Sequence, residues 1–313
     1  MINCSLGFDT SNYTTSVSVV SLDNRYYQSE KLLLPVSKGE IGLRQSDAVF
    51  LHTKQLPQLL DKLLDTNDYN IRSVCVSTRP RNDADSYMPC FLVGKCNAIS
   101  VSKALNVPCF QVSHQEGHIA AILFGANRLD LIKEPFIAFH LSGGTTEAVL
   151  VTPDSDRIFN ERVIARSLDL KAGQAIDRIG KLLCLDFPAG AQLDALAQKG
   201  ILTEKIKVSS NGCDISISDL ENKCKKMIDA GESKENIAMF CIQFIIHSLD
   251  KMISEIKKEY NLPLVFGGGV SSNSLLRDYF FEKYNAIFAP PVLSSDNAVG
   301  VAVISEILRS KNG

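Results

Sequence analysis

The sequence SHQEGHIAA at residues 113–121 is the most informative stretch of the chain. The apolar run that precedes it, residues 107–112, is typical of a buried strand. Ser113 is a residue type that favours the N-cap of a helix, and Glu116 three positions later completes the capping-box pattern. Gly125 is a suitable helix end. The stretch therefore predicts a strand followed directly by a short helix.

Two histidines, His114 and His118, are four residues apart on this predicted helix, which puts them on the same face. Two imidazoles one turn apart can share a metal ion, and a third histidine, His140, follows on the next predicted strand. The spacing alone leaves two interpretations open: a metal-binding pair, or two surface or capping histidines. The zinc-protease pattern HExxH is absent, because the glutamate stands two residues after the first histidine.

The composition indicates one large or two medium globular domains, since the chain has 313 residues and 45% of them are hydrophobic. A formal net charge of −2 does not indicate an obligate nucleic-acid binder, although a local basic patch can exist within a neutral total. The nine cysteines form no C-x-x-C pair and lie mostly in apolar runs, which predicts reduced thiols and a cytoplasmic protein. We recognise no signal-peptide pattern and no apolar run long enough to span a membrane.

Strand and helix patterns follow one another along the first part of the chain. Strands are predicted at residues 3–8, 16–22, 25–34, 71–77 and 107–112, and helices at 43–64, 91–105 and 114–125. The first two strands are joined by a polar turn, residues 9–15, whose hydroxyls and amides can bind phosphate. The alternative is that this turn only reverses the chain.

The second part repeats this plan. Strands are predicted at residues 135–141, 147–152, 262–266 and 286–289, and helices at 173–183, 191–198, 237–260 and 297–309. Two glycine-rich turns follow strands, at residues 142–146 and 267–273, and glycine lets backbone amides approach an anion closely. The second turn opens a helix whose N-terminus can bind phosphate. Residues 201–235 are polar, lysine-rich and weakly periodic, and we interpret them as an insertion.

Three polar or glycine-rich turns, each after a strand, in two similar halves predict a duplicated α/β nucleotide-binding fold with a cleft between the halves. The alternative for any single glycine turn is tight packing. We expect a first domain at residues 1–130, a second at residues 131–296, and a closing helix, residues 297–313, that packs back on the first domain.

Several short motifs follow one another along the chain: GFDTS at 7–11, HQEGH at 114–118, LSGGTTE at 141–147, AGQAIDR at 172–178, FPAG at 187–190, GGVSSN at 268–273 and DNA at 296–298. In this order they resemble the motifs G-I-E-T-S, H-x-E-G-H, V-S-G-G-H-T-Q, A-G-E-A-F-D-K, Y-P-G-G, G-G-V-A-A-N and D-N-G of the TsaD family of tRNA threonylcarbamoyltransferases, formerly described as O-sialoglycoprotein endopeptidases. The similarity runs from about residue 6 to residue 305. The resemblance implies two duplicated domains with the fold of actin, heat-shock proteins and sugar kinases.

The resemblance also implies which residues hold the ligands. His114, His118 and Asp296 match the family's metal ligands, and His140 stands where some relatives have a metal-binding tyrosine. Imidazole and carboxylate suit iron or zinc. The positions that match the family's substrate and nucleotide contacts are Asp9, Ser142, Gly143, Gly144, Thr145, Asp177, Gly190, Asp194, Gly268, Gly269 and Asn273.

By this resemblance we expect transfer of a threonylcarbamoyl group from threonylcarbamoyl-AMP to adenosine of tRNA, with one transition metal and with partners resembling TsaB and TsaE. An alternative is a diverged paralogue that binds metal and adenine nucleotide without transfer. A third interpretation, a metalloprotease, is disfavoured because the HExxH motif is absent. A departure bears on this choice: where the family has a glycine loop of the A-G-P-G-L type, residues 79–85 read RPRNDAD. We expect this loop either to swing away from the phosphate or to present its arginines to it, and favour the first.

Overall fold

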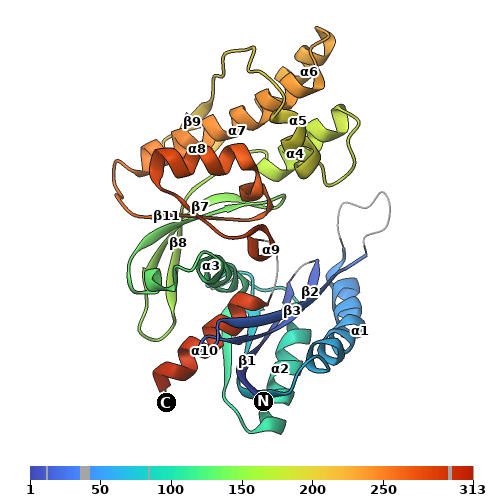
Figure 1. Cartoon of the computed structure of the whole chain (residues 1–313), viewed down its shortest axis with the longest axis vertical. Coiled ribbons are helices and arrows are strands. Elements are labelled where there is room, and N and C mark those ends of the chain that lie inside the picture. Colours follow the sequence, from blue (N-terminus) through green and yellow to red (C-terminus); the bar gives the residue numbers. More distant parts are fainter. Residues whose placement is uncertain (12, 36–42, 84, 295–297, 313) are drawn as a thin grey trace. The chain divides into compact units, whose positions relative to one another are not determined.

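The structure, a computed structural model, describes residues 1–11, 13–35, 43–83, 85–294 and 298–312. It divides into two compact units: unit 1 is Met1–Leu129 with Ser295–Gly313, and unit 2 is Asp130–Ser294. Each unit contains a five-stranded sheet with helices packed on it (Figure 1). The two units are described separately.

Unit 1 is built on a sheet with the strand order β3-β2-β1-β4-β5. Its strands are β1 (Ile2–Ser11), β2 (Thr14–Ser21), β3 (Tyr26–Leu33), β4 (Tyr69–Arg79) and β5 (Cys109–Ser113). Its helices are α1 (Gln45–Leu64), α2 (Phe91–Leu105), α3 (His114–Gly125) and α10 (Val299–Asn312). The expected start of the closing helix at Asn297 lies outside the described residues.

Unit 2 is built on a sheet with the strand order β12-β11-β6-β7-β8 and carries a separate two-stranded hairpin. Its strands are β6 (Phe136–Leu141), β7 (Thr146–Pro153), β8 (Phe159–Arg166), β9 (Ser209–Asn211), β10 (Asp214–Ser216), β11 (Leu264–Gly267) and β12 (Ile287–Phe288). Its α-helices are α4 (Ala172–Leu182), α5 (Gly190–Ala197), α6 (Asp219–Asp229), α7 (Lys234–Ile256), α8 (Ser274–Tyr284) and α9 (Pro291–Ser294). The 3-10 segments are η1 (Leu129–Lys133) and η2 (Gly269–Ser272).

The two large sheets have the same topology. In unit 1, β1 is antiparallel to β2 and parallel to β4, with β3 and β5 at the edges. In unit 2, β6 is antiparallel to β7 and parallel to β11, with β8 and β12 at the edges. The predicted duplicated α/β fold is therefore confirmed.

The central strand β1 is buried on both faces, so its alternate residues serve different layers. Leu6 and Phe8 lie in a core shared with residues of α1 and α2. On the opposite face a Cβ at Gly7 would be only 2.6 Å from the carbonyl oxygen of Ala298 at the start of α10. Asp9 shares the face of Gly7, which places it on the side of α3 and α10.

Helix α3 is fixed in place by backbone-to-backbone packing against α10. A Cβ at Gly300 in α10 would be 1.8 Å from the carbonyl oxygen of Gly117 in α3, so no larger residue fits there. A Cβ at Gly117 would in turn be 2.9 Å from a methyl group of Val301. The segment that carries the two histidines is thus held against a second helix from the far end of the chain.

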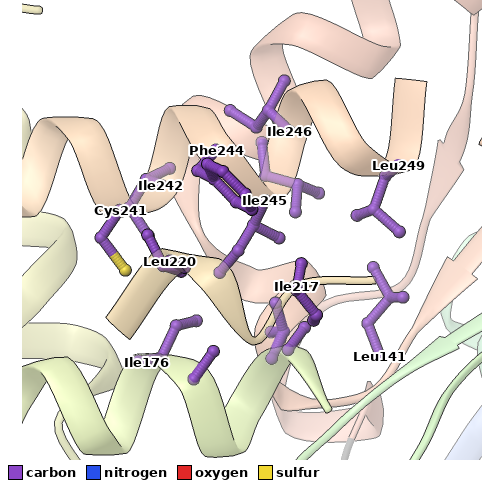
Figure 2. Close-up of a cluster of buried hydrophobic side chains, with 14 of the residues drawn as sticks. Leu141, Ile176, Ile217, Leu220, Cys241, Ile242, Phe244, Ile245, Ile246 and Leu249 are labelled. Carbon is purple, nitrogen blue, oxygen red and sulfur yellow. The ribbon is translucent and has the colours of Figure 1, made fainter. Parts of the chain in front are cut away.

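The core of unit 2 is organised by α7, whose buried residues share one hydrophobic cluster with residues of the sheet and of the neighbouring helices. Figure 2 shows Phe244, Ile245 and Leu249 of α7 with Ile176 of α4 and Leu141 of β6. By length and composition α7 could cross a membrane, so the sequence-based statement that no such run exists is wrong. Because 67% of its most apolar window is buried inside the protein, it is a core helix here.

Two parts of unit 2 were not predicted from the sequence. The edge strand β8 was missed, and residues 201–235 contain the β9–β10 hairpin and α6 rather than irregular structure alone. Leu220, Cys224 and Met227 of α6 are buried in the core of unit 2. This segment therefore contributes to the core and is not merely attached to it.

Candidate functional site

The histidine pair lies at the start of α3, as the sequence predicts. The hydroxyl of Ser113 accepts a hydrogen bond from the amide of Glu116 at 3.1 Å, and the Glu116 carboxylate accepts from the amide of Ser113 at 2.6 Å. The capping box is therefore confirmed. The Nε2 atoms of His114 and His118 are 2.9 Å apart, with the ring centroids at 4.3 Å.

Asp9 holds the first of these histidines. Its buried carboxylate lies 2.9 Å from Nδ1 of His114 and accepts hydrogen bonds from the hydroxyls of Ser77 and Ser11. Because an ionised carboxylate can only accept a hydrogen bond, Nδ1 of His114 carries the proton. Its Nε2, which faces His118, then has an unprotonated lone pair. The assignment of Asp9 to the substrate contacts stays a prediction, and in unit 1 its carboxylate is engaged with His114.

The pair fits a partial metal site. The two imidazole nitrogens, 2.9 Å apart, are close enough to bind one ion together. The carboxylate behind His114 is the usual outer partner of a metal-binding histidine. Within the described ranges no group of three or more metal-ligating side chains occurs. Asp296 lies outside the described residues, and His140 belongs to unit 2, on β6 opposite Glu147 of β7.

His52 is a fully buried histidine, separate from this pair. Its Nδ1 lies 2.7 Å from the hydroxyl of Thr15, which donates to Gln55, while its Nε2 has no partner within the described part of the chain. Burial lowers the pKa of His52 to about 4, and the charge of Asp9 opposes this shift only in part. His52 is therefore neutral near pH 7.

The charged loop that begins at Arg79 stays close to the histidine helix. The amide of Gln115 donates to the carbonyl of Pro80 at 3.1 Å, so the loop starts against the first turn of α3. The guanidinium of Arg79 donates to the side chains of Asn82 and Thr78. The beginning of the loop is thus tied to α3, and the expectation that the loop swings away from a bound phosphate stays a prediction.

The glycine-rich turn after β6 is closed by its own serine. The hydroxyl of Ser142 accepts from the amides of Gly144 and Thr145 at 3.3 and 3.0 Å, and the amide of Ser142 donates to the carbonyl of Thr145. Thr146 then connects the turn to α4, because its hydroxyl accepts from the amide of Ala172 at 2.8 Å. The turn is thus a rigid loop on the end of the sheet.

Two other glycines press against this turn. A Cβ at Gly173 in α4 would be 2.6 Å from the amide nitrogen of Gly143, and a Cβ at Gly268 would be 2.2 Å from the carbonyl oxygen of Leu141. Gly268 also has a φ of +89°, which only glycine adopts readily. Both glycine-rich turns and the start of α4 therefore meet at one place in unit 2.

The remaining glycines of the predicted site have open space at the position where a side chain would begin. A Cβ at Gly143, Gly144, Gly190 or Gly269 would meet no protein atom within 4 Å. The tight-packing alternative therefore explains Gly173 and Gly268, but not these four. We call the surface formed by Gly143, Gly144 and Gly269 the glycine cradle.

The predicted polar contacts of the nucleotide are already engaged within unit 2. The carboxylate of Asp194 accepts from the side chain of Asn273 at 2.9 Å and from the amide of Ser274 at 3.1 Å. Asn273 itself caps α8 through its side-chain oxygen. One oxygen of Asp177 accepts from the amide of Ala189 at 2.9 Å. These residues link α4, α5 and α8 around the cradle.

A family model described as TsaD, tRNA N6-adenosine threonylcarbamoyltransferase, matches residues 42–303. The chain belongs to the TsaD family. A TsaD relative from Persephonella marina (strain DSM 14350 / EX-H1) is 31% identical over 321 residues, covering 95% of this chain and 88% of the relative. Another, from Neorickettsia sennetsu (strain ATCC VR-367 / Miyayama), is 26% identical over 314 residues, covering 95% and 91%. Both are named tRNA N6-adenosine threonylcarbamoyltransferase, so the assignment to a transferase family is confirmed.

Solved structures with this fold extend beyond the TsaD family. Component A of the (R)-2-hydroxyglutaryl-CoA dehydratase of Acidaminococcus fermentans aligns with a TM-score of 0.57 at 13% identity, covering 99% of this chain and 100% of that chain. A ROK family glucokinase from Streptomyces griseus, crystallised with glucose and AMPPNP, aligns with a TM-score of 0.54 at 12% identity, covering 97% and 99%. At these identities the likeness shows the fold alone, which is that of the actin, heat-shock protein and sugar kinase superfamily.

Sequence reasoning missed two contacts that shape these sites. Ser77 hydrogen-bonds Asp9, and its signal was a hydroxyl directly after the apolar residues 74–76. Thr146 ties the glycine turn to α4, and nothing local in the sequence marks that contact.

Proposed function

We propose that this TsaD-family chain transfers a threonylcarbamoyl group from threonylcarbamoyl-AMP to adenosine in tRNA, and that the reaction depends on a metal. Support comes from the family match over residues 42–303 and from relatives with that name. Partners resembling TsaB and TsaE, and a cytoplasmic location where tRNA is available, belong to the same proposal.

The glycine cradle is the observation that carries the nucleotide part of the proposal. Bare glycine backbone lets a phosphate come close to amide groups, as in other anion-binding loops. The cradle is held rigid from behind by Gly173 and Gly268, so its amides need little rearrangement on binding. Asp177 has one oxygen engaged with Ala189, and we assign the other to a ribose hydroxyl of the nucleotide.

The metal part of the proposal assigns one ion to His114 and His118, the two histidines that unit 1 brings together, with Asp296 as the further ligand that the family resemblance implies. When bound, the ion would supply a Lewis acid that polarises a carbonyl or grips a phosphate. Asp9 keeps the proton on Nδ1 of His114, so that Nε2 stays available as a ligand. Imidazole and carboxylate donors would suit either iron or zinc, so the proposal keeps both metals.

The alternative, a paralogue that binds nucleotide without transferring the acyl group, is favoured by the loop at Arg79. In this structure the guanidinium of Arg79 donates to Asn82 and Thr78, so the loop offers no glycine amides and Arg79 does not extend from it. The two functions make opposite predictions about product formation, although both predict nucleotide binding.

Genetic complementation distinguishes the transferase from the paralogue that only binds nucleotide. A bacterium whose own TsaD can be depleted would express this chain, and threonylcarbamoyladenosine in its tRNA would be measured by mass spectrometry. We expect the modified nucleoside to persist with the wild-type chain and to disappear with a His114→Ala/His118→Ala variant. Loss of the nucleoside with a well-expressed wild-type chain would favour the paralogue.

A further inference from the structure

Helix α4 begins with a residue that the physics of helix ends disfavours. Its N-cap is Lys171, in an extended conformation with φ −83° and ψ 148°. N-caps are normally Ser, Thr, Asp or Asn, because their oxygens accept hydrogen bonds from the first amides. An ammonium group accepts none, and the partial positive charge at a helix N-terminus repels it. Departures from such local rules are expected where function requires them.

The ammonium group of Lys171 is fixed, but its charge is not neutralised by the protein. Nζ donates to the carbonyl of Ser167 at 2.8 Å, and the side chain is half-buried. Among the described residues no carboxylate forms an ion pair with it. The nearest acid in sequence, Asp169, accepts instead from Ser218 and from the amide of Ile217.

This charge stands beside the glycine cradle. The amide of Ser167 donates to the carbonyl of Thr146 at 2.8 Å, and the next residue after Lys171 donates to the hydroxyl of Thr146. Two residues after Lys171, Gly173 packs on Gly143. The ammonium and the N-terminus of α4 are thus both linked to the turn that carries the exposed glycines, all within unit 2.

We propose that Lys171 binds a phosphate group of the adenine nucleotide in the glycine cradle and so selects nucleotides over nucleosides. The inference rests on the proposed function, because it adds a binding residue to that site. An anion there relieves the repulsion between the ammonium and the helix N-terminus, since it attracts both. Lysine is a common phosphate ligand that acts as a point charge.

Calorimetry with AMP and with adenosine tests the proposal on the purified full chain. Lys171→Gln removes the charge but keeps an N–H donor for the carbonyl of Ser167, so the loop has the means to stay folded. We expect this variant to bind AMP about tenfold more weakly or worse, with adenosine affinity unchanged. Lys171→Arg should retain most of the AMP affinity. Lys181→Met, an exposed lysine at the other end of α4, is the matched control and should bind like wild type.

Each outcome decides a separate question. Equal losses for AMP and adenosine in Lys171→Gln would show that the lysine only holds the loop, and would overturn the proposal. Unchanged AMP affinity in that variant would overturn it as well, while leaving the nucleotide site intact. A wild-type chain that binds neither compound would instead refute the nucleotide site itself, and the role of Lys171 with it.

Discussion

Replacing Gly173 by alanine should destabilise unit 2, although alanine is normally the better helix former. The new Cβ would lie 2.6 Å from the amide nitrogen of Gly143 and 2.7 Å from the carbonyl carbon of Ser142. Both neighbours are backbone atoms, so neither can rotate away. Either α4 or the turn must shift, and the glycine cradle shifts with it.

The magnitude follows from two opposing effects. Alanine gains about 1 kcal/mol over glycine inside a helix. Overpacking costs about 1–3 kcal/mol, and rigid backbone neighbours place this contact near the upper end. The free energy of unfolding should therefore fall by about 2 kcal/mol. Gly190 is the matched control, because it also lies at the start of a helix but has nothing within 4 Å of its Cβ position. Gly190→Ala should leave stability unchanged or raise it by up to about 1 kcal/mol.

Urea unfolding followed by circular dichroism gives the comparison directly. The midpoint should fall for Gly173→Ala and not for Gly190→Ala, with the same dependence on urea concentration in both. AMP binding should weaken in Gly173→Ala, because its turn is displaced. If Gly173→Ala proved as stable as Gly190→Ala, the close contact between α4 and the turn would be wrong, and the geometry of the cradle with it.

Other expectations follow from the two candidate sites and from His52. Elemental analysis should find about one transition metal ion per wild-type chain and almost none in the His114→Ala/His118→Ala variant, and equal contents would refute the metal assignment. Asp177→Ala should weaken AMP binding by roughly 1–3 kcal/mol in calorimetry, through a lost hydrogen bond to the ribose, and unchanged affinity would remove that residue from the site. The pKa of His52 is about 4 in the folded state and about 6.5 in the unfolded state. As the pH falls, the unfolded state therefore binds a proton before the folded state does, and the free energy of unfolding should decrease by about 3 kcal/mol between pH 6.5 and pH 4. A His52→Asn variant should lose less over that range, whereas exposed His247→Asn should behave like wild type, and parallel pH profiles for all three would contradict this.

The sequence predicted best where the cause of structure is local. Ser113 and Glu116 form a capping box across three residues, so the start of α3 could be predicted directly. The glycine turns were also recognisable, because adjacent glycines directly after a strand are typical of a turn. The duplication followed from the repeated order of these elements.

Contacts between distant segments could not be predicted in this way. Asp9 and His114 are 105 residues apart and meet only because β1 and β5 flank the same strand, β4. Asp194 reaches Ser274 across 80 residues and supports the start of α8. The edge strand β8 was not predicted, because Asn160, Glu161 and Arg162 make its sequence polar. Such polarity is usual for an edge strand and unlike a buried strand.

The central claim is tested most directly by reconstituting the reaction. The purified chain, threonylcarbamoyl-AMP, tRNA and partners resembling TsaB and TsaE would be combined, and threonylcarbamoyladenosine would be measured after digestion of the tRNA, beside the Persephonella marina relative. We predict product with the wild-type chain and a large loss with His114→Ala/His118→Ala. Absence of product from a chain that still binds AMP, under conditions where the relative is active, would contradict the transferase function.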